Sequence, residues 1–138
     1  MIITRAQQSD LSSIIAINKR LSLPGKSFVY NKRNWIRSQI DAGNFHVAKE
    51  EDVEICAALC LEMHPKSASI ETIATKAGKE NMGYGHALIQ HAIELAREEG
   101  KKQLSVLSYS EYRAAGFYES CGFIVRKGES INSGTLDL

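Results

Sequence analysis

The chain has 138 residues, of which 43% are hydrophobic and 24% charged, and this length fits one globular domain that folds without disulfide or metal cross-links. The 17 Lys and Arg residues against 16 Asp and Glu residues give a formal net charge of +1. This balance lacks the strong basic excess of a dedicated nucleic-acid-binding protein, so we expect no nucleic-acid partner.

The first half of the chain predicts a strand, two helices and a hairpin. Hydrophobic residues recur at helical spacing after Ser9-Asp10, which we interpret as an N-cap, and again before Gly43, which ends a second helix. Two strand-like segments then flank the acidic turn Glu50-Glu51-Asp52. The expected elements are a strand over 2–6, helices over 9–21 and 31–42, and strands over 45–49 and 53–63.

The second half predicts a strand, a long helix and several shorter elements. The long helix carries one hydrophobic stripe and ends at Gly100. The expected elements are strands over 69–75, 104–108, 122–127 and 135–138, and helices over 85–99 and 111–120. This pattern, without repeats or a linker, predicts a single α/β domain over residues 1–138.

The cysteines and histidines indicate neither disulfides nor a metal site. Cys56, Cys60 and Cys121 form no C-x-x-C pair, so we expect reduced thiols in a cytoplasmic protein, with Cys56 and Cys60 on one strand face. His86 and His91 stand five residues apart on the long helix, not the four that would share one face. Apolar runs far shorter than roughly 20 residues and the lack of a signal-peptide layout predict no membrane partner.

The segment Glu80-Asn81-Met82-Gly83-Tyr84-Gly85-His86 forms a glycine-containing turn before the long helix. A helix start leaves up to four backbone N–H groups without internal partners and carries partial positive charge, so it binds phosphate well. A plain strand-to-helix turn that needs small residues explains the glycines equally well. A dinucleotide-binding loop would place its third glycine at Leu88, and a P-loop would need a following Gly-Lys-Ser/Thr.

Two blocks of the chain resemble the acetyl-CoA motifs of GNAT acetyltransferases. Ile70–Thr75 followed by Gly83-Tyr84-Gly85 is similar to the block written Q/R-x-x-G-x-G/A. Arg113-Ala114 and Phe117–Phe123 resemble the block N-x-R-A-x-x-x-Y-E-x-x-G-F, in the expected order. The two blocks together are far more specific than either alone.

The chain departs from these motifs at two acidic residues. Glu80 stands where the family usually has Gln or Arg, and Glu111 stands where Asn is common. An acid near a polyanion weakens binding by like-charge repulsion, so we expect lower cofactor affinity. Lys76, Lys79 and Arg113 are expected to offset this charge.

The resemblance implies a GNAT-like mixed, largely antiparallel sheet of six or seven strands flanked by about four helices. It implies an N-acetyltransferase that moves an acetyl group from acetyl-CoA to a primary amine by direct transfer in a ternary complex, without metal. A homodimer would fit the family. The alternative is a non-catalytic acyl-CoA-binding regulator or sensor of the same fold. The implied cofactor-binding residues are Ile73, Ala74, Thr75, Glu80, Asn81, Met82, Gly83, Tyr84, Gly85, His86 and Arg113.

Two residues are implied to act in the chemistry. Tyr118 matches the family tyrosine near the CoA sulfur and is the expected general acid, although a core aromatic beside Phe117 and Phe123 is the competing interpretation. Glu71 matches a position where the family often has a glutamate that acts through water, and an amine with a pKa of about 10.4 needs such a base. A solvated glutamate on a strand face is the alternative for Glu71.

Residues 11–40 contain six basic residues and no acid. In GNAT proteins this part of the chain usually frames the acceptor pocket, so Tyr30, Arg33, Trp35 and Arg37 are expected to bind an acceptor with a carboxylate or phosphate. A solvated basic face, or a patch that meets the acidic turn, is the competing interpretation.

Overall fold

The computed structural model describes residues 1–51 and 53–138, so the predicted turn residue Asp52 lies outside the described residues. The described chain contains two compact units, one of residues 1–61 and 72–88 and the other of residues 62–71 and 89–138. The strands are β1 (Ile2–Arg5), β2 (Phe45–Glu50), β3 (Glu54–Met63), β4 (Ser67–Thr75), β5 (Gln103–Tyr109), β6 (Ile124–Arg126) and β7 (Ile131–Asp137). The helices are α1 (Leu11–Asn18), α2 (Arg33–Asp41), α3 (Tyr84–Glu98) and α4 (Ala115–Ser120), with 3-10 turns η1 (Gln8–Asp10), η2 (Lys19–Leu21) and η3 (Ser110–Tyr112).

These strands form one mixed sheet of seven in the order β1-β2-β3-β4-β5-β7-β6. The pairing is parallel between β4 and β5, and antiparallel for β1 with β2, β2 with β3, β5 with β7 and β6 with β7. The predicted fold class, a mixed, largely antiparallel sheet of six or seven strands with about four helices, is confirmed within the described residues, which form seven strands and four α-helices. None of the helices in this part of the chain is both long and apolar enough to cross a membrane.

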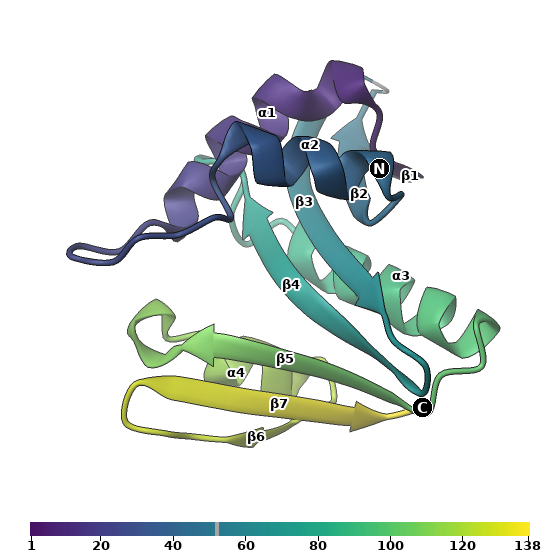
Figure 1. The fold of residues 1–138 in the computed structure, drawn as a ribbon, viewed down its shortest axis with the longest axis vertical. Coiled ribbons are helices and arrows are strands. Elements are labelled where there is room, and N and C mark those ends of the chain that lie inside the picture. The colour runs from purple at the N-terminus through teal and green to yellow at the C-terminus, as the bar shows by residue number, and fades with distance from the viewer. Residues whose placement is uncertain (52) are drawn as a thin grey trace. The chain divides into compact units, whose positions relative to one another are not determined.

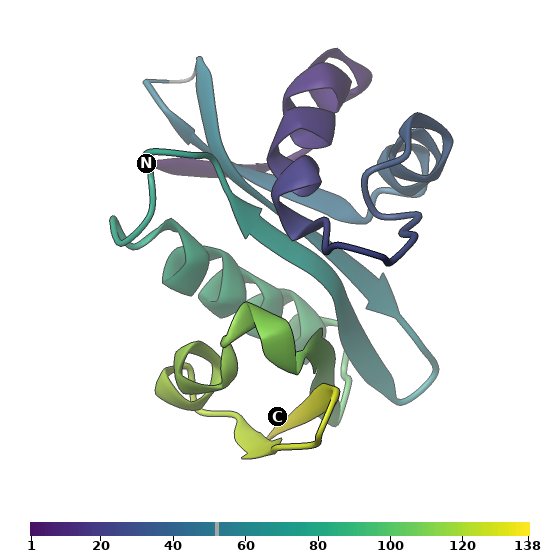
Figure 2. The ribbon, with the colours of Figure 1, turned by 90° about the vertical axis from the view of Figure 1, so that its left-hand side faces the viewer.

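In the first unit, α1 and α2 lie together on one side of the strands (Figures 1 and 2). Ile14 of α1, Ile36 of α2 and Phe45 of β2 are fully buried in one hydrophobic cluster. Each such side chain contributes about 1.5–3 kcal/mol through burial. The helical spacing of these residues in the sequence therefore reflects the face that the core covers.

Asp10 is the N-cap residue of the first helix, as predicted, but its side chain makes no capping hydrogen bond to that helix. The chain first makes the 3-10 turn η1, and the Asp10 carboxylate accepts a hydrogen bond from the Gln7 backbone N–H at 2.9 Å. Asp10 also pairs with Lys49 Nζ at 3.4 Å. Its carboxylate thus closes the preceding turn, and α1 begins one residue later at Leu11.

Cys56 and Cys60 do not share a strand face, contrary to the prediction. The β2–β3 register shifts between Ala48 and Lys49, because Ala48 pairs with Ala57 but Lys49 pairs with Ile55. Cys56 is therefore an extra residue of β3 between these two pairs. A bulge of this kind reverses the alternation of side chains along a strand. Cys60 therefore packs in the cluster under α1 and α2, whereas Cys56 contacts Tyr84.

In the second unit, β5, β7 and β6 form a small antiparallel sheet with α4 beside it (Figure 1). A Cβ at Gly134 of β7 would lie 2.9 Å from Val106 Cγ1, so this strand passes too close to its neighbour for a side chain. The strand β7 begins four residues before its predicted start, because pairing with β5 accommodates an Asn-Ser-Gly run of low strand propensity.

The predicted helix over 111–120 is instead two elements. Arg113 adopts a left-handed backbone conformation with φ of 54°, which ends the 3-10 turn η3 and separates it from α4. A non-glycine residue rarely adopts this conformation, so propensity alone would not place a break there. The block that contains Tyr118 is consequently one short helix of residues 115–120.

Candidate functional site

The glycine-containing turn joins the end of β4 to the start of α3. Gly78, Asn81 and Gly83 have φ values of 86°, 60° and 90°, all in the left-handed region. The Ala87 N–H bonds to the Gly83 carbonyl at 3.1 Å and opens the helical series, so the amides of Gly83, Tyr84 and Gly85 precede it. The structure thus has a long helix that begins at this turn. The first amides of this helix are the groups that the sequence predicts to bind an anion.

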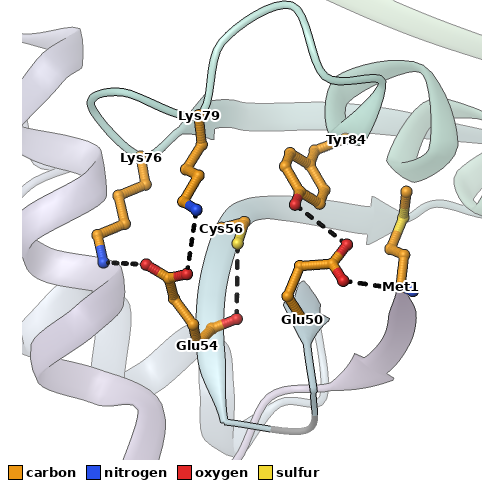
Figure 3. A network of polar contacts seen from close by, with 7 residues as sticks. All are labelled: Met1, Glu50, Glu54, Cys56, Lys76, Lys79 and Tyr84. Carbon is orange, nitrogen blue, oxygen red and sulfur yellow. Dashed lines mark hydrogen bonds and ion pairs between the residues drawn. The ribbon is translucent and has the colours of Figure 1, made fainter.

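The side chain of Tyr84 joins the start of α3 to Glu50 at the end of β2 (Figure 3). Tyr84 is 4% exposed, and its hydroxyl donates to Glu50 Oε1 at 3.0 Å. Glu50 in turn lies 3.7 Å from the N-terminal amine of Met1. Hydrogen bonding with Cys56 and with Glu50 raises the pKa of Tyr84, so its phenol stays neutral. The cofactor contact predicted for Tyr84 would therefore be made by its main chain.

Lys76 and Lys79 are paired with a strand residue (Figure 3). Their Nζ atoms lie 2.7 and 3.3 Å from the carboxylate of Glu54 at the start of β3. The hydrogen bonds from Lys76 and Lys79 lower the pKa of Glu54. Both lysines therefore pair directly with Glu54 and not with Glu80. Their expected offset of the Glu80 charge stays a prediction.

Glu80 is paired with an arginine that was not predicted to lie at this turn. Arg20, in η2, donates from Nη1 to the Thr75 carbonyl at 2.8 Å and from Nη2 to Glu80 Oε2 at 3.1 Å. The backbone N–H of Glu80, then Arg20 and the N–H of Gly78, lower the pKa of the Glu80 carboxyl. The acid-free basic run over 11–40 was the only sequence signal for this contact.

The end of β4 presents alternate residues to opposite faces. Ala74 is 8% exposed and packs in the hydrophobic cluster, whereas Ile73 and Thr75 are half-buried. The Lys76 N–H bonds to the Cys56 carbonyl at 2.8 Å and closes the strand. Beyond it, Asn81, Met82 and His86 have exposed side chains at the helix start.

Glu71 lies in a polar cluster formed by the β3–β4 hairpin of the second unit. Ser69 Oγ donates to Glu71 Oε1 at 2.9 Å and lies 2.8 Å from His64 Nε2. Because the single hydroxyl proton goes to Glu71, this geometry assigns an N–H to His64 Nε2. Burial, and after it the neighbouring carboxylate of Glu62, raise the pKa of Glu71. Glu71 is thus half-buried and hydrogen-bonded to Ser69, and its role as a base stays a prediction.

The same cluster bears on metal binding. Ligand atoms of Glu62, His64 and Glu71 all lie within 4.8 Å of one another, a set that can hold a metal ion. Sequence spacing did not show this group, because a hairpin brings together residues from two strands and their connection. The expectation of no metal stays a prediction.

Tyr118 lies on α4 in the second unit and is 6% exposed. Its ring makes edge-to-face contacts with Phe117 and Phe123 at centroid separations of 5.2 and 5.7 Å. Burial raises its pKa well above 10, with smaller contributions from Cys121 and Tyr112. The packing role predicted for this residue is present, and the phenol stays protonated at neutral pH.

The predicted acceptor residues divide into an aromatic pair and an exposed basic pair. The rings of Tyr30 and Trp35 meet edge to face at 5.2 Å, and Trp35 contacts Phe45 of the core at 5.9 Å. Arg33 and Arg37 are exposed on α2. The structure thus joins Tyr30 and Trp35 to the core and leaves both arginines facing solvent.

The model of one protein family matches most of the chain, including both motif blocks. Residues 14–123 match the model of the acetyltransferase (GNAT) family. Since this match covers more than half of the chain, the chain belongs to the GNAT acetyltransferase family.

Solved structures share this fold at low sequence identity. Rv2747 from Mycobacterium tuberculosis, in complex with CoA, is 17% identical with a TM-score of 0.85, over 100% of this chain and 99% of that one. N-acetylglutamate synthase from Neisseria gonorrhoeae, with coenzyme A and N-acetyl-glutamate, is 19% identical with a TM-score of 0.81. The match covers 99% of this chain but 35% of that longer one. Ribosomal-protein-alanine N-acetyltransferase from Brucella melitensis is 18% identical with a TM-score of 0.78, over 100% of both chains.

Proposed function

We propose that this protein is an acetyl-CoA-dependent N-acetyltransferase that transfers an acetyl group directly to a primary amine in a ternary complex. Residues 1–138 would form one catalytic domain. The observation that carries the proposal is the glycine turn with its left-handed Gly83 at the start of a long helix, in a chain of this family. Two structures of similar fold contain CoA, which supports the same cosubstrate here.

In this proposal the cofactor is held mainly by backbone groups. The amides from Met82 to His86 bind the pyrophosphate, because a helix start offers donors and partial positive charge together. The main chain of Ile73, Ala74 and Thr75 faces the pantetheine arm and the thioester carbonyl. Arg113 adds positive charge from the second motif block.

The chemistry requires a neutral amine and a protonated leaving group. Glu71 accepts the amine proton, and its raised pKa brings this carboxylate closer to the range in which a general base is effective. Ser69 and the exposed imidazole of His64 connect Glu71 to solvent, which gives the proton an exit.

The amine nitrogen then attacks the thioester carbon, the C–N bond forms, and the C–S bond breaks as the tetrahedral intermediate collapses. Tyr118 gives its proton to the departing thiolate of CoA and regains one from water. Its raised pKa keeps the phenol protonated and available throughout the neutral range.

We further propose that the acceptor carries a carboxylate or phosphate. The exposed guanidinium groups of Arg33 and Arg37 lie on the helix that also carries Trp35, within a stretch of six basic residues and no acid. Such a surface attracts anions and can hold a carboxylate through two parallel hydrogen bonds. One structure of similar fold contains N-acetyl-glutamate, a dicarboxylate.

A second function, a CoA-binding sensor without turnover, is favoured by one observation. Tyr118 is packed between two phenylalanine rings, and burial makes its phenol a weaker acid. In a sensor this residue would serve packing alone.

Calorimetry with acetyl-CoA and a thiol-release assay over a panel of amines separate the two functions. The panel should include amino acids, polyamines, lysine peptides and peptides with free N-termini. Binding together with amine-dependent thiol release supports the transferase. Binding without release across the panel supports the sensor, and the absence of both rejects the proposed function.

A further inference from the structure

The turn that precedes α3 contains an acid, Glu80, close in sequence to the amides proposed to bind the pyrophosphate. Glu80 stands two residues before Met82, and its side chain is half-exposed at 46%. A carboxylate at this point opposes a polyanion by about 1 kcal/mol for each unit charge at 4 Å in water. If that charge is not countered, the turn binds an anionic cofactor more weakly.

Arg20 is the cation that the structure places on this carboxylate. Its two terminal nitrogens reach two different parts of the turn, the Thr75 carbonyl at 2.8 Å and the Glu80 carboxylate at 3.1 Å. The planar guanidinium fixes the two contacts relative to each other, which a lysine could not do. The contact joins η2 to the end of β4 across 55 residues of sequence.

The other cations of the turn have a different partner. Lys76 and Lys79 both pair with Glu54, whose single negative charge they share. The backbone N–H groups of Glu80 and Gly78 also favour the ionised Glu80 carboxylate. These contacts hold the carboxylate on Arg20 and on the N–H groups of Gly78 and Glu80.

We propose that Arg20 is a positioning residue for the cofactor. It neutralises Glu80 and fixes the turn to the end of β4, so that the amides after Met82 meet the pyrophosphate without an opposing charge. This inference rests on the proposed use of acetyl-CoA.

The test is a double-mutant cycle on CoA affinity, measured by calorimetry with CoA as the probe. Arg20→Gln leaves Glu80 uncompensated, and we expect Kd to rise by about 3- to 10-fold. Glu80→Gln removes the carboxylate, so CoA binds as tightly as to the wild type or more tightly. In the double variant Arg20→Gln/Glu80→Gln, Kd returns to within about twofold of the Glu80→Gln value, because no charge remains to be countered.

Two further variants distinguish this role from a general effect of charge or folding. Lys19→Gln removes the same charge from the adjacent exposed residue of η2, and we expect Kd to stay at the wild-type value. Arg20→Lys keeps the charge but loses the two fixed N–H donors of the guanidinium group. Its Kd for CoA should therefore lie between those of the wild type and Arg20→Gln. Thermal unfolding of each variant confirms that the fold is kept.

The outcomes separate this inference from the proposed function. If wild-type protein fails to bind CoA, both are rejected. If it binds CoA but Arg20→Gln binds equally well, or if the losses in the cycle are additive, only the role of Arg20 is rejected. A Kd change in Lys19→Gln as large as that in Arg20→Gln would also reject it, since net charge would then explain the effect.

Discussion

In the turn before α3, the charged side chains are paired with neighbouring elements, whereas the second unit keeps ionisable groups in buried or half-buried surroundings that shift their pKa values. The ion pairs there join Glu80 to Arg20, and Lys76 and Lys79 to Glu54. In the proposed function, the main chain of the turn is then the part that binds the ligand. Glu71 and Tyr118 have raised pKa values caused first by burial.

This difference predicts which substitutions change the affinity for the cofactor and which change the chemical step. A site that binds through backbone amides tolerates side-chain changes unless they alter the backbone or leave a charge unpaired. A site that moves protons depends on single side chains and on their pKa values. Substitutions in the turn should therefore change the affinity for CoA, and substitutions in the second unit should change kcat and its pH dependence.

The largest effect is expected at Tyr118. Tyr118→Phe removes the proton donor but keeps the ring between Phe117 and Phe123, so kcat should fall by ~10²–10⁴-fold while KM for acetyl-CoA changes little. In the wild type, kcat should not decline up to pH 9, because the pKa of Tyr118 lies well above 10.

Steady-state kinetics of Tyr118→Phe, with Tyr112→Phe of η3 as the matched control, check this expectation. Unchanged kcat together with a shifted melting temperature would assign Tyr118 to packing alone and would favour the sensor.

Glu71 should show the next largest effect. Glu71→Gln should lower kcat by about 10²-fold near neutral pH, because the amine then loses its base. A raised pKa means that the carboxyl becomes a base only above that pKa, so activity of the wild type should fall as the pH drops through it.

Ser69→Ala sharpens the test of Glu71. The Ser69 hydroxyl donates to the Glu71 carboxylate and lowers its pKa, so its removal should move the acidic limb of the pH–rate profile to higher pH. A profile with the same acidic limb in Ser69→Ala and wild type would show that this limb does not report Glu71.

Much of the fold could be predicted from the sequence because the hydrophobic pattern follows the buried faces. The spacing of Ile14, Ile36 and Ile40 marked two helices, and all three are buried in one cluster. The errors lie where backbone geometry overrides local pattern. The bulge near Cys56 reversed a strand face, and the left-handed Arg113 divided a helix.

In the candidate site too, some features could be predicted from the local sequence and others could not. Motif residues such as Gly83 lie close together in sequence, and their role in a turn could be predicted from that spacing. The partners of Glu80 and Glu71 could not, because Arg20 lies 60 residues away in sequence and His64 joins Glu71 only through a hairpin. A single sequence carries no direct signal for such contacts.

A smaller effect is expected at Gly83, where the turn depends on backbone conformation. Gly83 has φ of 90° and no neighbouring atom within 4 Å of an added Cβ, so Gly83→Ala introduces strain without a clash. This strain costs about 1–2 kcal/mol, and relaxing it would reshape the turn, which predicts ~5- to 30-fold weaker CoA binding.

Gly25→Ala is the control, since Gly25 also has a left-handed φ of 74° with open space but lies outside the turn. It should lower stability by a similar amount and leave the CoA Kd unchanged. If both variants bind CoA as tightly as the wild type, the turn does not hold the cofactor through its backbone.

The smallest effect is expected on the acceptor side, where the charges are exposed. Arg33→Glu and Arg37→Glu reverse charges at the surface of α2, where solvent and salt screen each interaction to below about 1 kcal/mol. We therefore expect each variant to raise KM for an anionic acceptor by ~3- to 10-fold at low salt, less at high salt, and to leave KM for acetyl-CoA unchanged. The two arginines would then act on the acceptor alone, just as Arg20 acts on the cofactor alone. Equal KM values for anionic and neutral acceptors in all variants would instead assign this face to solvent, and acceptor choice would have to come from other residues.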